Sequence, residues 1–293
     1  MRYGWRGRLD TSAEEFRKLL PEGVLHVGLT ISEPIQILGA EQAASAFERM
    51  VDAGKRLANE QVDVIVCGGA PVALSRGTGG DAELAELLRR ETGLPVVTAN
   101  GVVVEALRLF GARSVVAVSP FAEARNQDIR SFLEASGFHV LAAQGLGLIK
   151  NIDFANQSAE AAFTLARRAV SAHPQADAIY IACPRWPTVD IIAALEADTG
   201  KPVVAAAAAM VWGALRAIKI MDCQSGYGSK LLMKQSRPGR EVPRLTRGIG
   251  RKVLNVLPHC VVRPVRKTAV IRRESYPELK QQLQCGYPKH ESR

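Results

Sequence analysis

The sequence lacks the residue patterns that mark membrane, secreted and metal-binding proteins. Its longest apolar run, Pro202–Trp212, is too short to span a bilayer, and Met1–Asp10 is polar and basic with no apolar stretch behind it. The 5 cysteines are widely spaced without a CxxC pair, and the 5 histidines show no metal-ligand spacing. We therefore expect no signal peptide, membrane segment, disulfide framework or metal site, and we expect a cytoplasmic protein.

Aromatic residues are also scarce, at 5% of the 293 residues, although apolar residues make up 47%. Most of the apolar content is Ala, Val and Leu, and Gly is frequent. Small side chains of this kind suit the contacts between helices and sheets in α/β layers. The length is sufficient for two domains of ordinary size.

Positive charge is concentrated at the C-terminal end of the chain. Residues 234–293 hold 15 Lys/Arg and 4 Asp/Glu, a net charge of +11, so the total of +9 leaves −2 for residues 1–233. We therefore do not expect nucleic acid as a partner of the folded body, although a basic tail could bind anionic polymers. We predict that 234–293 is a disordered basic tail, in which Val253–Leu257 and Val261–Val265 have the composition of short strands.

Strand-like and helix-like segments alternate along residues 24–220. Short β-branched runs such as Val62–Cys67 are typical of buried parallel strands, and periodic segments such as Glu41–Asn59 are typical of amphipathic helices. This alternation predicts an α/β fold with parallel sheets and right-handed crossovers. We expect strands at 24–31, 62–67, 95–98, 114–119, 140–145, 178–183 and 203–207, and helices at 41–59, 81–91, 103–110, 122–136, 158–171, 188–199 and 210–220.

An internal repeat divides the chain into two similar lobes. The segment Glu91–Val97, ETGLPVV, recurs as Asp198–Val204, DTGKPVV, and each copy leads into a helix that contains Ala-Leu-Arg. The strand before each copy also matches, beginning at Asp63 in one and at Asp177 in the other. We predict a first lobe of residues 1–112 plus 208–233 and a second lobe of residues 113–207.

The repeat pairs Gly69 with Cys183. Each residue lies six positions after its strand aspartate, Asp63 or Asp177, where a parallel strand ends and its loop begins. Ligands of open α/β sheets bind at such carboxyl ends. If the lobes face each other, Gly69 and Cys183 look into one cleft.

Cys183 is the candidate catalytic residue. A thiol at a strand–helix junction can donate a proton to a carbanion, remove an α-proton or add to an alkene carbon. The alternative interpretation is an inert core cysteine, because free Cys is often buried. Cys67 is a weaker candidate for a base, since its register differs from that of Cys183.

The loop Gly68-Gly69-Ala70-Pro71 is the predicted carboxylate cradle. Glycines let backbone N–H groups approach an anion closely, and such donors stabilise charge on a carboxylate oxygen. A plain tight turn after the strand is the alternative. Gly77–Gly80 and Gly145–Gly147 do not complete a nucleotide-binding motif, so we expect no cofactor.

Other polar and aromatic residues stand at the same ends of the predicted strands. Ser119 could donate to the same carboxylate or could cap the following helix. Asn151 could bind substrate, although asparagine in a loop often forms turns. Arg185 and Trp186 flank Cys183 and could wall the site, or they could be a surface arginine and a packing tryptophan.

The ordered set of motifs resembles the maleate isomerase and arylmalonate decarboxylase branch of the aspartate/glutamate racemase superfamily. The resemblance covers roughly residues 3–233 and includes the strand that leads to Cys183. The segments that carry it are Leu195–Val204, Trp212–Arg216, Ser119–Phe121 with Asn126, and Gly226–Gly228 with Leu231 and Leu232.

The resemblance implies two pseudo-symmetric flavodoxin-like lobes with an active site between them. Racemases and isomerases of the superfamily place one Cys in each lobe, whereas arylmalonate decarboxylase has Gly at the first position, as this chain has Gly69. The resemblance therefore implies an arylmalonate-decarboxylase-like lyase that acts without a cofactor on a small carboxylic acid through proton transfer by Cys183. The predicted substrate-binding residues are Gly68, Gly69, Ala70, Pro71, Ser119, Phe121, Asn151, Pro184 and Trp186.

Two other functions stay open at this point. One is a maleate cis–trans isomerase or a racemase-type isomerase, and the other is a non-catalytic protein that binds a carboxylate in the cleft. The sequence is compatible with a homo-oligomer.

Overall fold

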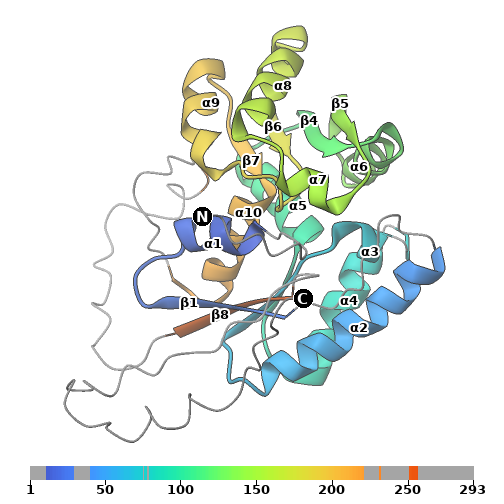
Figure 1. Ribbon diagram of the computed structural model, residues 1–293, viewed down its shortest axis with the longest axis vertical. Coiled ribbons are helices and arrows are strands. Elements are labelled where there is room, and N and C mark those ends of the chain that lie inside the picture. The colour runs from blue at the N-terminus through green and yellow to red at the C-terminus, as the bar shows by residue number, and fades with distance from the viewer. Residues whose placement is uncertain are drawn as a thin grey trace, which may run out of the picture. The chain divides into compact units, whose positions relative to one another are not determined.

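The structure is a computed structural model that describes residues 11–29, 40–74, 76–77, 79–220, 231 and 251–256. It contains two four-stranded parallel sheets (Figure 1). The first has the order β1-β8-β2-β3 and the second β5-β4-β6-β7. The strands are β1 (Val24–Gly28), β2 (Val64–Cys67), β3 (Val96–Thr98), β4 (Ser114–Phe121), β5 (His139–Leu148), β6 (Ala178–Ile181), β7 (Val203–Ala205) and β8 (Arg251–Val256).

Helices connect and cover these strands, as the predicted alternation requires. Each strand and helix predicted between residues 24 and 220 has a counterpart, and the prediction of two lobes with parallel sheets is confirmed. Val261–Val265 lies outside the described residues. Three short helices, α1, α3 and α7, were not predicted. The helices are α1 (Ser12–Leu19), α2 (Ala40–Ala58), α3 (Ala70–Leu74), α4 (Gly80–Thr92), α5 (Ala99–Leu109), α6 (Glu123–Ala135), α7 (Asn151–Ala155), α8 (Ala159–Ala172), the 3-10 helix η1 (Val189–Ile191), α9 (Ile192–Thr199) and α10 (Ala206–Ala217).

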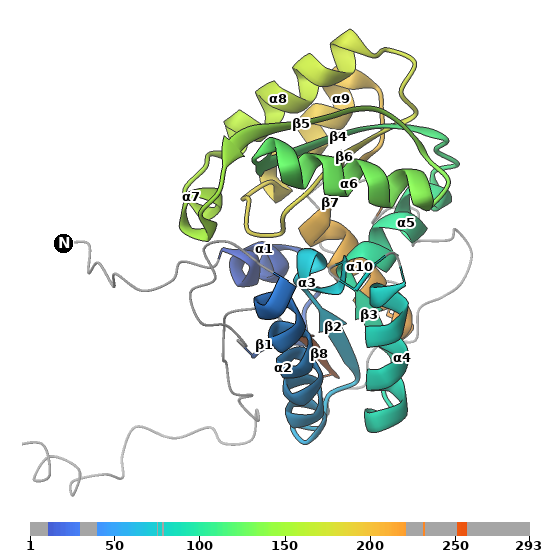
Figure 2. The same cartoon turned by 90° about the vertical axis from the view of Figure 1, so that its right-hand side faces the viewer.

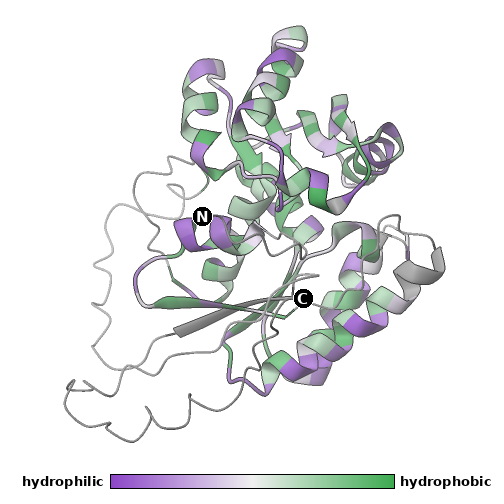
Figure 3. Ribbon diagram, in the orientation of Figure 1, coloured by the Kyte–Doolittle hydropathy of each residue, from purple (hydrophilic) through white to green (hydrophobic). Residues whose placement is uncertain are grey.

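Strand β2 shows how the first sheet is buried on both faces. Val64 and Val66 pack into the core shared with α1, α5 and α10, whereas Ile65 and Cys67 pack against α2 and α4. Alternate residues of a strand point to opposite faces, so a strand covered on both sides must be apolar throughout. Helices α2 and α4 lie against each other beside this sheet (Figure 2), and the helices that cover the sheets carry both hydrophobic and hydrophilic residues (Figure 3).

Strand β8 overlaps Val253–Leu257, a segment with the composition of a short strand, but its place in a sheet was not predicted. It lies within residues 234–293, for which we predicted a tail outside the two lobes, yet it pairs in parallel with both β1 and β2. Its place between β1 and β2 matches that of β4 between β5 and β6 in the second sheet. A strand between β1 and β2 satisfies backbone N–H and C=O groups that would otherwise be left without ladder partners. The need to pair these backbone groups explains why β8, although distant in sequence, joins the sheet of β1 and β2.

Helix α10 follows the second copy of the repeat and packs on the first sheet. Its residues from Ala206 to Leu215 are all buried, and it contacts β2, β3 and α5. A Cβ atom at Gly213 would lie 2.4 Å from Cγ2 of Val102, so the close approach of α10 to α5 requires glycine there. Within the described ranges, none of the helices combines the length and hydrophobicity that crossing a bilayer requires.

Candidate active site

The turns after β2 and β6 have the same backbone conformation. Gly69 has a φ of +79°, and Cys183, at the repeat-related position, has a φ of +80°. In both turns the carbonyl accepts a hydrogen bond from the N–H three residues on, at 2.8 Å for Val72 to Gly69 and 3.1 Å for Trp186 to Cys183. The repeat found in the sequence therefore extends to the geometry of the two turns.

Cys183 holds a conformation that residues with a side chain rarely adopt. A left-handed φ costs a residue other than glycine about 1–2 kcal/mol, and it persists only where the surrounding structure enforces it. Such residues cluster at active sites. Cys183 has 9% of its surface exposed, and its thiol is not in a disulfide. The strain marks this thiol as a functional candidate.

The loop after Cys183 is anchored within the second lobe. Trp186 is fully buried, and its Nε1 donates to the carbonyl of Ser158 at 3.1 Å. The N–H of Ala182, immediately before the cysteine, donates to the carbonyl of Val118 on β4 at 2.8 Å. Trp186 therefore packs in the core beneath the loop. Pro184 is half-buried beside the cysteine.

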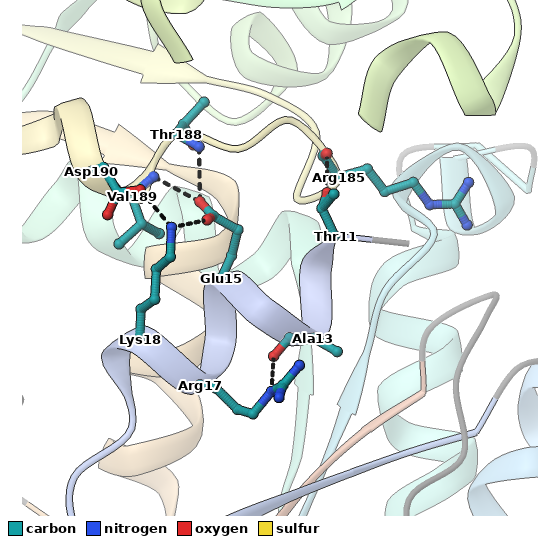
Figure 4. A network of polar contacts seen from close by, with 9 residues as sticks. All are labelled: Thr11, Ala13, Glu15, Arg17, Lys18, Arg185, Thr188, Val189 and Asp190. Atoms are coloured by element: carbon teal, nitrogen blue, oxygen red, sulfur yellow. Dashed lines mark hydrogen bonds and ion pairs between the residues drawn. The ribbon is translucent and has the colours of Figure 1, made fainter. Parts of the chain in front are cut away.

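Helix α1 contacts the same loop from the side of the first lobe (Figure 4). The buried carboxylate of Glu15 accepts hydrogen bonds from the N–H groups of Thr188 at 2.8 Å and Val189 at 2.7 Å. Hydrogen bonds to a charged group contribute about 1.5–3 kcal/mol each. The Thr11 hydroxyl also donates to the carbonyl of Arg185. No sequence pattern pointed to this contact, because its partners are separated by more than 170 positions.

Lys18 extends this network along α1. Its Nζ pairs with the Glu15 carboxylate at 3.0 Å and with Asp190 in η1. Burial by itself lowers the pKa of Lys18, but hydrogen bonds to Asp190 and Glu15 and their negative charges raise it above its ordinary value. Lys18 therefore stays charged and balances the two carboxylates.

Arg185 is buried between Cys183 and Trp186, with 7% of its surface exposed. The interpretation of Arg185 as a surface residue is thus wrong. Its side chain points away from Glu15 (Figure 4). A guanidinium can pair with a carboxylate in two-point fashion.

The cradle turn is held by a polar cluster that the sequence analysis did not identify. The buried Asp81 carboxyl accepts hydrogen bonds from the Thr98 hydroxyl, from Gly101 N at 2.9 Å and from Asn100 Nδ2 at 3.1 Å. Asn100 Nδ2 also reaches the carbonyl of Ala70 at 3.4 Å. Gly68 is buried, and Gly69, Ala70 and Pro71 are half-buried. An aspartate in the first turn of a helix is common, so only the fold reveals this role.

Burial shifts the pKa of two groups near these turns, Asp81 and Tyr180. Burial raises the pKa of Asp81, and hydrogen bonds from Thr98, Gly101 and Asn100 offset part of this rise. Burial also raises the pKa of the Tyr180 hydroxyl, and the negative charges of Cys183 and Asp81 raise it further. Tyr180 is therefore a neutral hydroxyl within electrostatic range of Cys183.

Ser119 takes part in a local network at the end of β4. Its hydroxyl donates to Asn126 Oδ1 at 2.6 Å and accepts from Phe121 N at 2.9 Å. Helix α6 begins after Ala122 without a side-chain cap, so Ser119 is not its N-cap. The Ser119 hydroxyl already donates its proton to Asn126, so this hydroxyl would have to rotate before it could donate to a substrate.

A glycine on the neighbouring strand permits this arrangement. A Cβ atom at Gly145 would lie 2.1 Å from the Phe121 carbonyl oxygen and 2.4 Å from Asn126 Nδ2. Phe121 packs edge-on against Phe154 of α7, with ring centroids 4.9 Å apart. Asn151 begins α7, but its side chain lies outside the described residues.

Cys67 does not fit the role of a second base. It is 1% exposed and packs with Met50, Val72 and Leu84 on the face of the sheet that α2 and α4 cover. Burial raises the pKa of its thiol, and the charge of Asp81 raises it further. The described part of the chain holds no group of three or more His, Cys, Asp or Glu that could bind a metal.

Comparison with known proteins identifies the family of this chain. The family model described as arylmalonate decarboxylase matches residues 27–232. The chain belongs to the arylmalonate decarboxylase family. Arylmalonate decarboxylase from Bordetella bronchiseptica is 28% identical over 172 residues, which are 59% of this chain and 72% of the relative. Maleate isomerase from Geobacillus stearothermophilus is 23% identical over 181 residues, with 60% and 71% covered.

Solved structures with the same fold include maleate isomerases. Maleate isomerase Iso from Pseudomonas putida S16 matches with a TM-score of 0.65 at 22% identity, over 73% of this chain and 100% of that one. A Nocardia farcinica maleate cis-trans isomerase mutant with a covalently bound succinylcysteine intermediate matches with a TM-score of 0.59 at 19% identity, with 73% and 100% covered.

This member of the arylmalonate decarboxylase family is thus an enzyme of the aspartate/glutamate racemase superfamily, a decarboxylase or an isomerase. The resemblance inferred from the sequence motifs is confirmed. The alternative of a non-catalytic carboxylate-binding protein does not agree with this membership. The catalytic role of Cys183 and the choice between the two reactions stay predictions.

Proposed function

We propose that the protein is a cofactor-independent lyase that decarboxylates a small malonate-type acid, with Cys183 as the proton donor. The observation that carries this proposal is the matched pair of turns, in which Gly69 and Cys183 share one conformation but only Cys183 has a side chain. Two thiols on opposite faces of a carbon would favour racemisation, whereas one thiol supplies one proton.

The proposed binding mode uses the cradle turn for the carboxylate that remains. A left-handed residue such as Gly69 turns successive backbone N–H groups towards one side, as in anion-binding nests. In the proposal, amides of Gly68, Gly69 and Ala70 donate to the carboxylate. Asn100, which also donates to Asp81, donates to the Ala70 carbonyl and so supports this turn.

The proposed step balances as follows. The bond between the α-carbon and the departing carboxylate breaks, CO₂ leaves, and the electron pair stays on the α-carbon as an enediolate. Amide donors at the remaining carboxylate stabilise this charge. The Cys183 S–H bond then gives its proton to the α-carbon, and the thiolate regains a proton from water. Because a single thiol donates the proton, a malonate with two different α-substituents, such as methylphenylmalonate, is expected to give a chiral product.

Maleate isomerisation is the second candidate. The succinylcysteine adduct named for the Nocardia farcinica isomerase indicates that a thiol in this fold can add to an alkene carbon. In this chain, a Cys183 thiolate would add to one alkene carbon, the single bond would rotate, and the thiolate would leave.

Parallel assays of the wild type, Cys183→Ser and Cys67→Ser with phenylmalonate, methylphenylmalonate and maleate in D₂O test both candidates. Cys67→Ser is the matched control, because the Cys67 thiol is buried on the face of the first sheet that α2 and α4 cover. We expect CO₂ release and a product with one deuterium at the α-carbon from wild type and Cys67→Ser. Fumarate formation would favour isomerisation. Equal rates for wild type and Cys183→Ser would refute the catalytic thiol.

A further inference from the structure

Helix α1 links the first lobe to the loop that carries Cys183. The loop runs from Cys183 to Asp190, within η1, and leads into α9. Thr11 contacts its middle at the Arg185 carbonyl, and Glu15 contacts its far end at two consecutive N–H groups. Thr11, the N-cap residue of α1, and Glu15 lie about one helical turn apart, so both can contact the loop.

The loop must resist a relaxation that its own sequence favours. Cys183 holds a left-handed φ of +80°, and such a residue tends to return to an ordinary conformation when its neighbours allow it. Pro184 has no N–H to donate, so the residue after the cysteine adds no backbone N–H hydrogen bond of its own. Ala182 and Trp186 anchor the turn on the side of the second lobe, and contacts further along the loop help to keep it in shape.

Glu15 meets this need because its buried carboxylate contacts both the loop and Lys18. Its side chain is 2% exposed and accepts two N–H groups at the start of η1, where unsatisfied donors are concentrated. Lys18 holds the other carboxylate oxygen at 3.0 Å and also reaches Asp190. The carboxylate is thus fixed from both sides, and it fixes Thr188 and Val189 in turn.

We infer that Glu15 is a positioning residue which, with Thr11, holds the loop from Cys183 to Asp190 and so sets the place and exposure of the thiol. This inference rests on the proposed function for its catalytic consequence. Its structural part concerns only the position of the loop, so the structural part and the catalytic consequence can be tested separately.

Iodoacetamide labelling of Cys183, followed by peptide mass spectrometry over a range of pH, tests the structural part without any substrate. Glu15→Gln keeps the size of the side chain but removes its charge and one acceptor. We expect it to label Cys183 severalfold faster than wild type, because the loosened loop exposes the thiol. Thr11→Val should give a smaller increase.

Glu14→Gln is the matched control, since it makes the same change one position earlier on α1 at an exposed site. Its labelling rate should equal that of wild type. Labelling of the buried Cys67 should stay unchanged in every variant, which shows that the fold is intact. If Glu15→Gln fails to fold, the labelling rate of Cys183 in Thr11→Val tests the inference instead. Equal Cys183 labelling in Glu15→Gln and Glu14→Gln would overturn the inference.

Turnover provides the second readout. We expect kcat of Glu15→Gln to fall by about tenfold to a hundredfold, the size of effect that a small misplacement of a reacting group produces, with little change in KM. Faster labelling without turnover of any acid by the wild type would support the positioning of the loop and contradict the proposed function. Turnover that persists in Cys183→Ser would contradict the proposed function alone.

Discussion

Gly69 and Cys183 occupy the same left-handed turn in the two lobes, with φ values of +79° and +80°. Each carbonyl accepts a hydrogen bond from the N–H three residues later. The duplicated unit therefore keeps its backbone at this point, while the side chain is present in only one lobe. The proposed asymmetry of the chemistry follows from this single difference.

Gly69→Ala should fold and should lower the free energy of unfolding by about 1–2 kcal/mol, the cost of a side chain at this φ. The new Cβ has room, because its nearest neighbours are Sδ of Met50 and Cγ2 of Val72, each at 3.7 Å. Urea unfolding measures the change. Gly93→Ala calibrates it, since Gly93 has a φ of +69° and no atom within 4 Å of the Cβ position. A much larger cost at Gly69 would show that the site lacks room.

Truncation before β8 should destabilise the first lobe. A chain that ends at Gly250 loses the strand between β1 and β2, and both strands are then left with unpaired backbone groups. A chain that ends at Arg263 keeps the strand and removes only the unit Pro264–Arg293. We expect lower helix and strand signals in circular dichroism, and an earlier urea midpoint, for the shorter chain only. Equal midpoints for the two chains would show that β8 adds no stability.

His26 should make the protein less stable in mild acid. Its ring packs edge-on against Phe16 at 5.4 Å between centroids, and burial, with the nearby charge of Arg17, lowers its pKa from 6.5 to about 4. The unfolded state therefore binds this proton more tightly. The free energy of unfolding should be unaffected above pH 6.5 and should fall between pH 6.5 and 4, by at most about 3 kcal/mol.

Urea unfolding of wild type and His26→Gln at several pH values measures this contribution, because their difference removes the effect of other groups. His139→Gln serves as the control, since His139 is exposed. We expect the loss of stability between pH 6.5 and 4 to shrink in His26→Gln and to persist in His139→Gln. The same pH dependence in both variants would show that His26 is not responsible.

The sequence by itself determined the two α/β lobes, the repeat and the pairing of Gly69 with Cys183. These features depend on short-range patterns, namely β-branched runs, helical periodicity and the spacing from Asp63 or Asp177 to the end of a strand. Such patterns survive in the linear chain, so they could be predicted. The family followed from the same ordered motifs.

Only the tertiary structure decided what holds the site. Glu15 meets Thr188 and Val189 across more than 170 positions. Asp81 meets Thr98 and Gly101 because α4 packs against β3 and α5. The insertion of β8 beside β1 likewise joins distant segments. Contacts of this kind depend on which buried hydrogen-bond donors lack a partner once the sheets have formed. Neither the local propensities of the residues nor their spacing along the chain determines which donors these are.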